Sequence, residues 1–280
     1  MVETLAKLDR AFDELRYDEM ADAIYHFVWG TFCDWYVELV KGEFHEETKA
    51  VAAWAFDQIL VMLHPLMPFI TEELWHAMPR GDDKRPYDLI LAKWPEPEAQ
   101  VDPHAKREIE WLIGTVSEFR SLRAEFSIPY STKLTPRLVE RNEKAPVRLE
   151  RYVGQIIRLI GARTIMLSGR DKLLKSLKDN PALVWDDQGV DVSSEALQVI
   201  VGDEIWLLPT KGLIDVEAER ARLSKAAAAA EKERDSLAQR LANPNFAERA
   251  KPEAVEKARA DHDAKSAEAE RLRAALDRLG

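Results

Sequence analysis

Cysteine is almost absent from this sequence, and Cys33 is the only one among 280 residues. A single cysteine excludes a disulfide within the chain and a cysteine-rich zinc site. Cys33 lies in the apolar string 32–36, which predicts a buried thiol and not a reactive one. The N-terminus has no signal-peptide pattern, so we expect a cytoplasmic location.

Glycine and long hydrophobic runs are also scarce. None of the 11 glycines belongs to a glycine-rich loop that could cradle a phosphate. No apolar run approaches the roughly 20 residues that a membrane span needs, so we expect no membrane partner. The six histidines show no helical ligand spacing with a third ligand nearby, so no metal site is expected.

Charge is unevenly distributed along the chain. The net charge of −10 argues against nucleic acid, but residues 1–119 carry −13 and residues 120–178 carry +9. A basic stretch inside an acidic chain can bind a polyanion. It can also dock on the chain's own acidic first segment, and the sequence leaves both interpretations open.

The spacing of apolar residues predicts a mainly α protein whose first domain, residues 1–130, is a helical bundle. Leu5, Leu8, Phe12 and Leu15 form the first apolar face, and Asp18 and Thr71 are predicted N-caps. The predicted helices span 3–16, 18–39, 48–63, 103–126 and a segment from Pro68 or Thr71 to 78. Proline and glycine in 80–103 predict an irregular connection.

The pattern then changes to a small α+β linker module over residues 131–211. Strands are predicted at 134–139 and 164–167, with a helix at 145–160 between them. Residues 196–201 and 205–208 flank a turn around Gly202 and predict a β-hairpin.

The last segment, residues 212–280, has the pattern of an antiparallel coiled-coil hairpin. Mainly apolar residues recur at alternating steps of three and four and form two predicted seams, which are separated by a break at 243–246. The seam positions are 213, 216, 220, 223, 227, 230, 234, 237 and 241, then 255, 258, 262, 265, 269, 272, 276 and 279. Each arm of such a hairpin would extend roughly 45 Å.

Several strings resemble the valyl-tRNA synthetase family of the class Ia aminoacyl-tRNA synthetases. They run in the family's chain order: 25–36, 64–75 followed by Trp94-Pro95, 119–125 followed by Ile128-Pro129, 207–209 leading into 212–223, and 241–246 followed by 252–256. The resemblance covers nearly the whole chain and corresponds to the family's C-terminal part. It implies an anticodon-binding helical bundle followed by a coiled-coil arm that reaches the tRNA elbow.

The family's catalytic signatures are missing from the sequence. It has no His-Ile-Gly-His-like string and no Lys-Met-Ser-Lys-Ser-like loop. The resemblance therefore implies a tRNA-binding fragment that is inactive alone, with no catalytic residue and no cofactor. ATP, Mg²⁺ and valine chemistry would belong to the full enzyme. The implied partners are tRNA(Val) and the missing N-terminal catalytic domain, and we expect a monomer.

Candidate tRNA-binding residues in the bundle are exposed cations near helix ends and one tyrosine. They are Arg16, Tyr17, Lys41, Arg80, Lys84, Arg85, Arg120 and Arg123. Arg120 and Arg123 lie three residues apart, so they could hold one phosphate together. The alternative for each candidate is a solvated surface residue, and for Arg120 and Arg123 it is a surface ion pair with Glu118 or Glu125. The rings in 25–36 are expected in the core, although an exposed one could stack on an unpaired base.

Candidates in the arm are Arg220, Arg234, Phe246, Arg249 and Lys251. The two seam arginines either extend their charged ends to solvent or mark a tRNA-facing edge. Phe246 either contacts the tRNA elbow or closes the turn against Leu241 and Val255.

A second function remains open. Helical-hairpin arms also occur on ribosome-associated proteins, so a stand-alone coiled-coil adaptor for the ribosome or a protein partner is the alternative.

Overall fold

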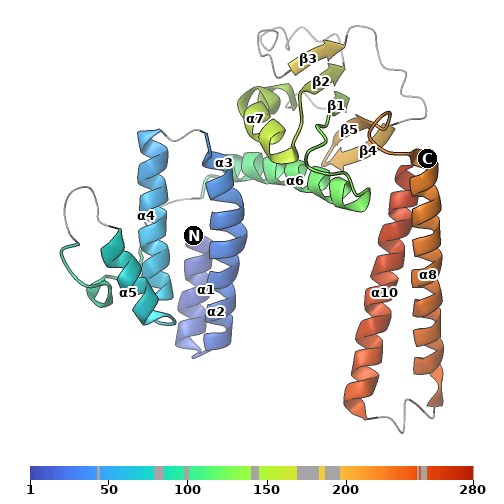
Figure 1. Ribbon diagram of the computed structural model, residues 1–280. Coiled ribbons are helices and arrows are strands. Elements are labelled where there is room, and N and C mark those ends of the chain that lie inside the picture. Colours follow the sequence, from blue (N-terminus) through green and yellow to red (C-terminus); the bar gives the residue numbers. More distant parts are fainter. Residues whose placement is uncertain are drawn as a thin grey trace. The chain divides into compact units, whose positions relative to one another are not determined.

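The computed structural model (Figure 1) is mainly helical, with one small sheet. The structure describes residues 1–42, 45–78, 85–97, 101–139, 145–168, 183–186, 196–244, 246 and 251–279. Two compact units, Met1–Lys106 and Arg107–Gly280, make up the chain. Within the described ranges, every helix is too short or too polar to cross a lipid bilayer.

The first unit is built from helices in chain order. They are α1 (Val2–Asp13), α2 (Tyr17–Tyr25), η1 (His26–Val37), α3 (Glu38–Val40), α4 (Glu46–Leu63), α5 (Pro68–Ala77) and the short η2 (Leu89–Leu91). These positions confirm the predicted helices within a few residues. The connection around η2 is otherwise irregular where it is described, as the prolines predicted.

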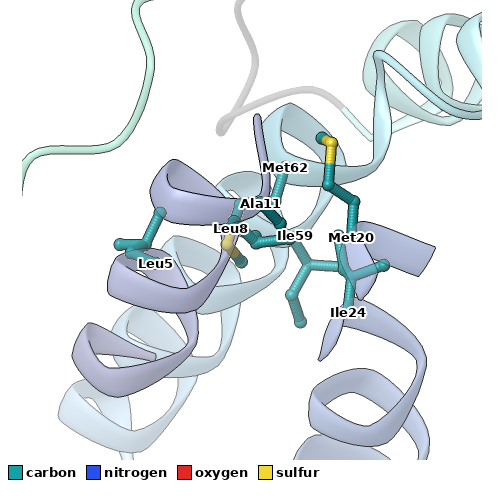
Figure 2. Close-up of a cluster of buried hydrophobic side chains, with 7 residues drawn as sticks. All are labelled: Leu5, Leu8, Ala11, Met20, Ile24, Ile59 and Met62. Atoms are coloured by element: carbon teal, nitrogen blue, oxygen red, sulfur yellow. The ribbon is translucent and has the colours of Figure 1, made fainter. Parts of the chain in front are cut away.

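The core of this unit lies where α1, α2 and α4 meet. Figure 2 shows Leu5, Leu8 and Ala11 facing Met20, Ile24, Ile59 and Met62, and all seven are buried. The predicted apolar face of the first helix is wrong in its second half. The helix ends at Asp13 and Leu15 adopts a positive φ of 55°, so Phe12 and Leu15 are 52% and 67% exposed. Ala11 fills the space instead.

A π-helical stretch, η1, continues α2 without a break. Its hydrogen bonds span five residues, so each turn holds more residues than an α-helical turn. The predicted stripe still faces the core: Met20 and Ile24 are buried, and Phe27 and Val28 pack against them. Tyr25 and Trp29 lie off this stripe and are each 60% exposed. Cys33 is half-buried, so the expected buried thiol is wrong.

The proline corner between α4 and α5 forms as predicted, but its cap differs. Pro68 occupies the first turn of α5, where its missing N–H costs nothing. Thr71 lies inside the helix and is buried, so its predicted N-cap role is wrong. Its hydroxyl donates to the Met67 carbonyl at 2.8 Å and lies 2.8 Å from Nδ1 of His64. Asp18 is likewise inside α2, whose N-cap is Arg16.

The second unit contains a five-stranded mixed sheet of order β3-β2-β1-β5-β4. The strands are β1 (Arg137–Val139), β2 (Ile165–Ser168), β3 (Leu183–Asp186), β4 (Ala196–Val201) and β5 (Glu204–Pro209). The predicted β-hairpin is confirmed, with Val201 opposite Glu204 and Gly202 at φ +56° in the turn. Strand β3, parallel to β2, was not predicted.

Two helices accompany the sheet, α6 (Pro103–Glu125) and α7 (Ala145–Ile160). Phe119 of α6 meets Trp206 of β5 edge-on at 5.6 Å, and both are fully buried. Trp111 of α6 lies beside Tyr152 of α7, with ring centroids 6.4 Å apart. Ile109 is 37% exposed, so its predicted inward position is wrong.

Two long helices, α8 (Val216–Ala242) and α10 (Pro252–Arg278), lie side by side (Figure 1). Asp215 caps α8 by accepting a hydrogen bond from the Ala218 N–H at 3.0 Å. Contacts between the helices run in opposite chain directions: Arg220 reaches the Leu279 carbonyl and Lys265 pairs with Glu233. Every predicted seam position from 213 to 241 and from 255 to 279 is buried or half-buried.

The predicted division at residues 130 and 211 stays a prediction, because the two compact units are a coarser grouping.

Candidate nucleic-acid interface

The cations predicted at the helix ends of the first unit are exposed and held by neighbouring carboxylates. Arg16 donates to Asp18 at 3.1 and 2.9 Å and lies 2.9 Å from Glu19. The Asp18 hydrogen bond raises the pKa of Arg16, and Arg16 lowers the pKa of Asp18. Lys41 pairs with Glu38. A phosphate could recruit these cations only by competing with the carboxylates.

Arg85 is a structural residue, and the prediction of an exposed phosphate ligand is wrong. Its side chain is 5% exposed and forms two hydrogen bonds with the buried carboxylate of Asp57. Its guanidinium stacks on the Trp75 ring at 3.8 Å, and Nε donates to the carbonyls of Trp75 and Met78 at 3.1 Å. Arg80 and Lys84 lie outside the described residues.

Arg123 is also buried, so the predicted phosphate clamp with Arg120 is wrong. Its guanidinium donates to five carbonyls, those of Ile128, Pro129, Thr132, Ile160 and Gly161. Burial lowers the pKa of Arg123. Arg120 is exposed, so the two side chains do not share a surface. Arg123 instead fixes the end of α6 to the turn that follows α7.

Exposed aromatic rings line α2 and η1, although the rings in 25–36 were expected in the core. Tyr17, Tyr25 and Trp29 are 59%, 60% and 60% exposed, and Tyr25 meets His26 edge-on at 5.6 Å. Exposed rings of this kind can stack on unpaired bases. Tyr17 was predicted, whereas Tyr25 and Trp29 were not singled out. Tyr25 follows the buried Ile24 and Trp29 follows the half-buried Val28, so both rings lie off the face that packs on the core.

The basic stretch is partly used inside the second unit. Arg148 donates to Glu108 at 2.9 Å, and Arg123 and Arg137 are buried. Glu108 belongs to the acidic first segment, so the docking interpretation holds for this pair. Lys133 and Arg163 remain exposed, and Lys133 lies 5.3 Å from the exposed ring of Tyr130. The Tyr130 hydroxyl donates to the Arg158 carbonyl.

The two seam arginines of the long helices have defined partners. Arg220 donates to the Leu279 carbonyl at 3.1 Å and lies 3.7 Å from Glu217. Arg234 donates to Asp235 at 2.9 and 2.7 Å. Arg220 therefore joins the two helices. Whether either arginine also faces tRNA stays a prediction.

Phe246 lies between the two long helices in the chain and is half-buried. The Arg240 guanidinium stacks on its ring at 4.3 Å, and its N–H donates to the Asn243 carbonyl at 3.0 Å. Lys251 is exposed at the N-cap of α10, and Arg249 lies outside the described residues. Arg240, which the sequence reasoning did not select, adds a cation to this end.

One histidine has two carboxylates within ligand distance, and the sequence expectation of no metal site stays a prediction. His76 Nε2 lies 3.2 Å from Glu72 and 3.1 Å from Asp88, and Glu72 also accepts the Leu89 N–H at 2.7 Å. Glu72 and His76 are one helical turn apart, and Asp88 comes from the following connection. All three ligand atoms lie within 4.8 Å of one another. His76 Nε2 can donate a hydrogen bond to a carboxylate of this cluster, so hydrogen bonding accounts for the arrangement.

Comparison with protein families identifies both ends of the chain. Residues 1–138 match the model of the anticodon-binding domain of tRNA ligases. Residues 215–280 match the model of the valyl-tRNA synthetase tRNA-binding arm.

The whole chain is also similar to curated proteins. It is 49% identical to the valine--tRNA ligase of Rhizorhabdus wittichii, with 100% of the chain aligned to 29% of that protein. The identities are 43% for Sphingopyxis alaskensis and 41% for Zymomonas mobilis, over 100% and 97% of the chain and 31% and 29% of those proteins. The chain thus spans less than a third of the length of these relatives.

Proposed function

The chain belongs to the valine--tRNA ligase family, and we propose that it is the tRNA-binding C-terminal part of such an enzyme. The observation that carries this proposal is the order of the two family matches. An anticodon-binding domain at 1–138 and a tRNA-binding arm at 215–280 are two RNA-binding parts, and whole-chain relatives join them in one protein.

In this proposal the first unit binds the anticodon stem-loop. Bases in a loop are unstacked, so they can be held by aromatic rings while cations hold the phosphates. The exposed rings of Tyr17, Tyr25 and Trp29 lie on one continuous helical segment, 17–37. Arg16 stands at the beginning of that segment and supplies an exposed guanidinium.

The helices α8 and α10 form an antiparallel coiled-coil hairpin in this proposal. Support comes from the sheltered seam positions and from pairs such as Glu233 with Lys265 that run in opposite directions. Buried Ala227, Ala230, Ala258 and Ala269 allow the helices to approach closely. A helix of 27 residues extends about 40 Å, so the end carrying Arg240 and Phe246 can reach a remote part of the tRNA.

The contribution of this part to the enzyme is orientation. Two contacts far apart on one tRNA place its acceptor end in the catalytic part of the enzyme. This chain itself then takes no part in the reaction. The use of ATP, Mg²⁺ and valine then belongs to the remaining part of the longer relatives, and the chain works as a cytoplasmic monomer. An ATP–pyrophosphate exchange assay on this chain is expected to show no activity.

The decisive experiment measures binding of the full chain to valine tRNA and to a leucine tRNA at two salt concentrations. We expect tighter, salt-sensitive binding to valine tRNA. Replacing Trp29 by Ala should weaken binding by about 1–3 kcal/mol, the worth of one base–aromatic stack. Trp54→Ala is the matched control, because Trp54 is 40% exposed on another helix.

Two outcomes would overturn the proposal. Equal affinity for both tRNAs would contradict the proposed preference for valine tRNA. No binding at low salt would favour the adaptor interpretation, and protein partners would then be tested.

A further inference from the structure

Glu125 is the last residue of α6, and its carboxylate lies where an acid is electrostatically unfavourable. The C-terminal end of a helix carries partial negative charge, which repels a carboxylate. The side chain is 19% exposed, and its Oε1 is buried without a hydrogen-bond partner. Burial, and secondarily Glu118, raise the pKa of Glu125, against the effect of Arg278. A residue held at this cost requires a compensating partner.

The partners come from both long helices. Arg278 of α10 lies 2.6 Å from Oε2 of Glu125, and Arg222 of α8 donates to the Glu125 backbone carbonyl at 3.0 Å. Arg222 is itself oriented by Glu219 through hydrogen bonds of 3.0 and 2.9 Å. One residue thus receives an arginine from each helix of the arm, and these arginines are 97 and 153 positions away.

Apolar contacts surround this junction. Leu223 and Ala275 are 1% and 0% exposed and line a groove together with Ala124 and Leu272. The groove is open on one side and about 600 Å³ in volume, and Glu118 and Arg271 also line it, so the junction is partly polar. The two arginine contacts are therefore the directional part of the junction.

Hydrogen bonds and buried side chains anchor the chain on the other side of Glu125. Arg123, two residues earlier, donates to five carbonyls, and Phe126 and Ile128 are buried. Glu125 consequently lies at an anchored end of α6, whereas the two arginines that contact it belong to the α8–α10 arm.

We propose that Glu125 is a positioning residue that fixes the direction of the α8–α10 arm through Arg222 and Arg278. The expected gain in tRNA affinity from Glu125 rests on the proposed function. The effect of Glu125 on the orientation of the arm does not depend on that function. An arm with fixed direction loses less orientational freedom when it binds a tRNA already held elsewhere.

The test measures a distance distribution between two spin labels in the full chain. The labels are placed at Gly154→Cys on α7 and Lys257→Cys on α10, in a Cys33→Ser background. Both positions are exposed, and a side chain at Gly154 meets no atom within 4 Å. We expect a narrow distribution for this parent and a clearly broader one for Glu125→Gln and for Arg278→Gln.

The matched control is Glu231→Gln, which removes an ion pair with Arg273 between the two arm helices themselves. It should leave the distribution narrow. Circular dichroism checks that every variant keeps its helix content; if Glu125→Gln does not fold, Arg278→Gln tests the contact from the arm side. An unchanged distribution in the folded variants would overturn the proposal.

Binding to valine tRNA gives a separate second readout. Glu125→Gln is expected to weaken binding about three- to tenfold through reduced pre-organisation. A broadened distribution with no tRNA binding by any variant, parent included, would refute the proposed function and leave the positioning role intact. A broadened distribution with unchanged affinity would refute only the benefit for tRNA binding.

Discussion

At the scale of single residues, Arg123 has the largest set of buried hydrogen bonds described for one side chain. A lysine at this position has three donors on one nitrogen and cannot reach carbonyls in two directions. We expect Arg123→Lys to lower the free energy of unfolding by about 2–4 kcal/mol, because buried carbonyls are left without donors. Urea denaturation followed by circular dichroism measures this decrease.

Arg120→Lys is the control for that measurement. Arg120 is exposed on the same helix, so its replacement should change stability by less than about 0.5 kcal/mol. Equal effects of the two variants would contradict the structural role given to Arg123.

Glu204 predicts a specific dependence of stability on pH. Its side chain is 1% exposed and accepts a hydrogen bond from Trp111 Nε1 at 3.0 Å. Burial raises the pKa of Glu204 above the ordinary glutamate value, although the Trp111 hydrogen bond and the Arg148 charge oppose the rise. The folded state therefore binds this proton more tightly than the unfolded state. The resulting stability is complete below the ordinary pKa and is lost as pH rises through the raised pKa.

Glu204→Gln keeps an acceptor for Trp111 and removes the charge. The stability of the variant relative to the parent should increase between about pH 4.5 and neutrality, and unfolding by urea at several pH values measures the difference. Glu217→Gln, an exposed change on α8, should show no such trend. A parallel pH profile for parent and Glu204→Gln would exclude the assigned cause.

The arginines show where sequence reasoning ends at this scale. In the sequence, Arg85 and Arg123 look like ordinary surface cations. In the structure, Arg85 pairs with Asp57, and Arg123 donates to carbonyls up to 38 residues away. Such partners depend on the tertiary fold and leave no periodic signal in the sequence. The exposure of Tyr25 and Trp29 has another origin, because both residues lie beside the apolar stripe of their helical segment and not on it.

At the scale of elements, periodicity was sufficient for nearly every helix. The proline corner, the β4–β5 hairpin and both seams of the long helices were predicted from local pattern. Strand β3 was missed because it is only four residues long and, among the described residues, lies at the edge of the sheet next to β2. Nothing local distinguishes so short a segment from a loop. Its neighbours in the sheet, not its own residues, make it a strand.

The small residues between α8 and α10 carry a prediction at this scale. Ala269 is 2% exposed, so a leucine there overpacks the space between the helices. We expect Ala269→Leu to destabilise the pair by about 1–3 kcal/mol, measured by the thermal loss of helix signal. Ala264→Leu, an exposed change on the same helix, should be nearly neutral. A melting curve for Ala269→Leu that matches this control would show that the helices do not pack closely there.

At the scale of the whole molecule, a protein of net charge −10 is proposed to bind a polyanion. Affinity must then come from local cations, and it should fall steeply with salt. The double variant Arg240→Gln and Lys251→Gln should reduce the salt slope of valine tRNA binding by about one to two, because each cation removed leaves about one phosphate without its neutralising charge. Arg273→Gln removes a cation already paired with Glu231 and should leave the slope unchanged. Identical slopes for all three proteins would place the phosphate-binding cations elsewhere.

The length of α8 and α10 gives the junction at Glu125 a geometric consequence. A rod of about 40 Å amplifies any angular error at its base, so a tilt of about 0.1 radian moves the far end about 4 Å. That displacement exceeds the length of a hydrogen bond, about 3 Å. The position of the far end of the arm therefore depends on the contacts at its base, where Arg222 and Arg278 meet Glu125. The longer the arm, the more precisely its direction must be fixed at its base.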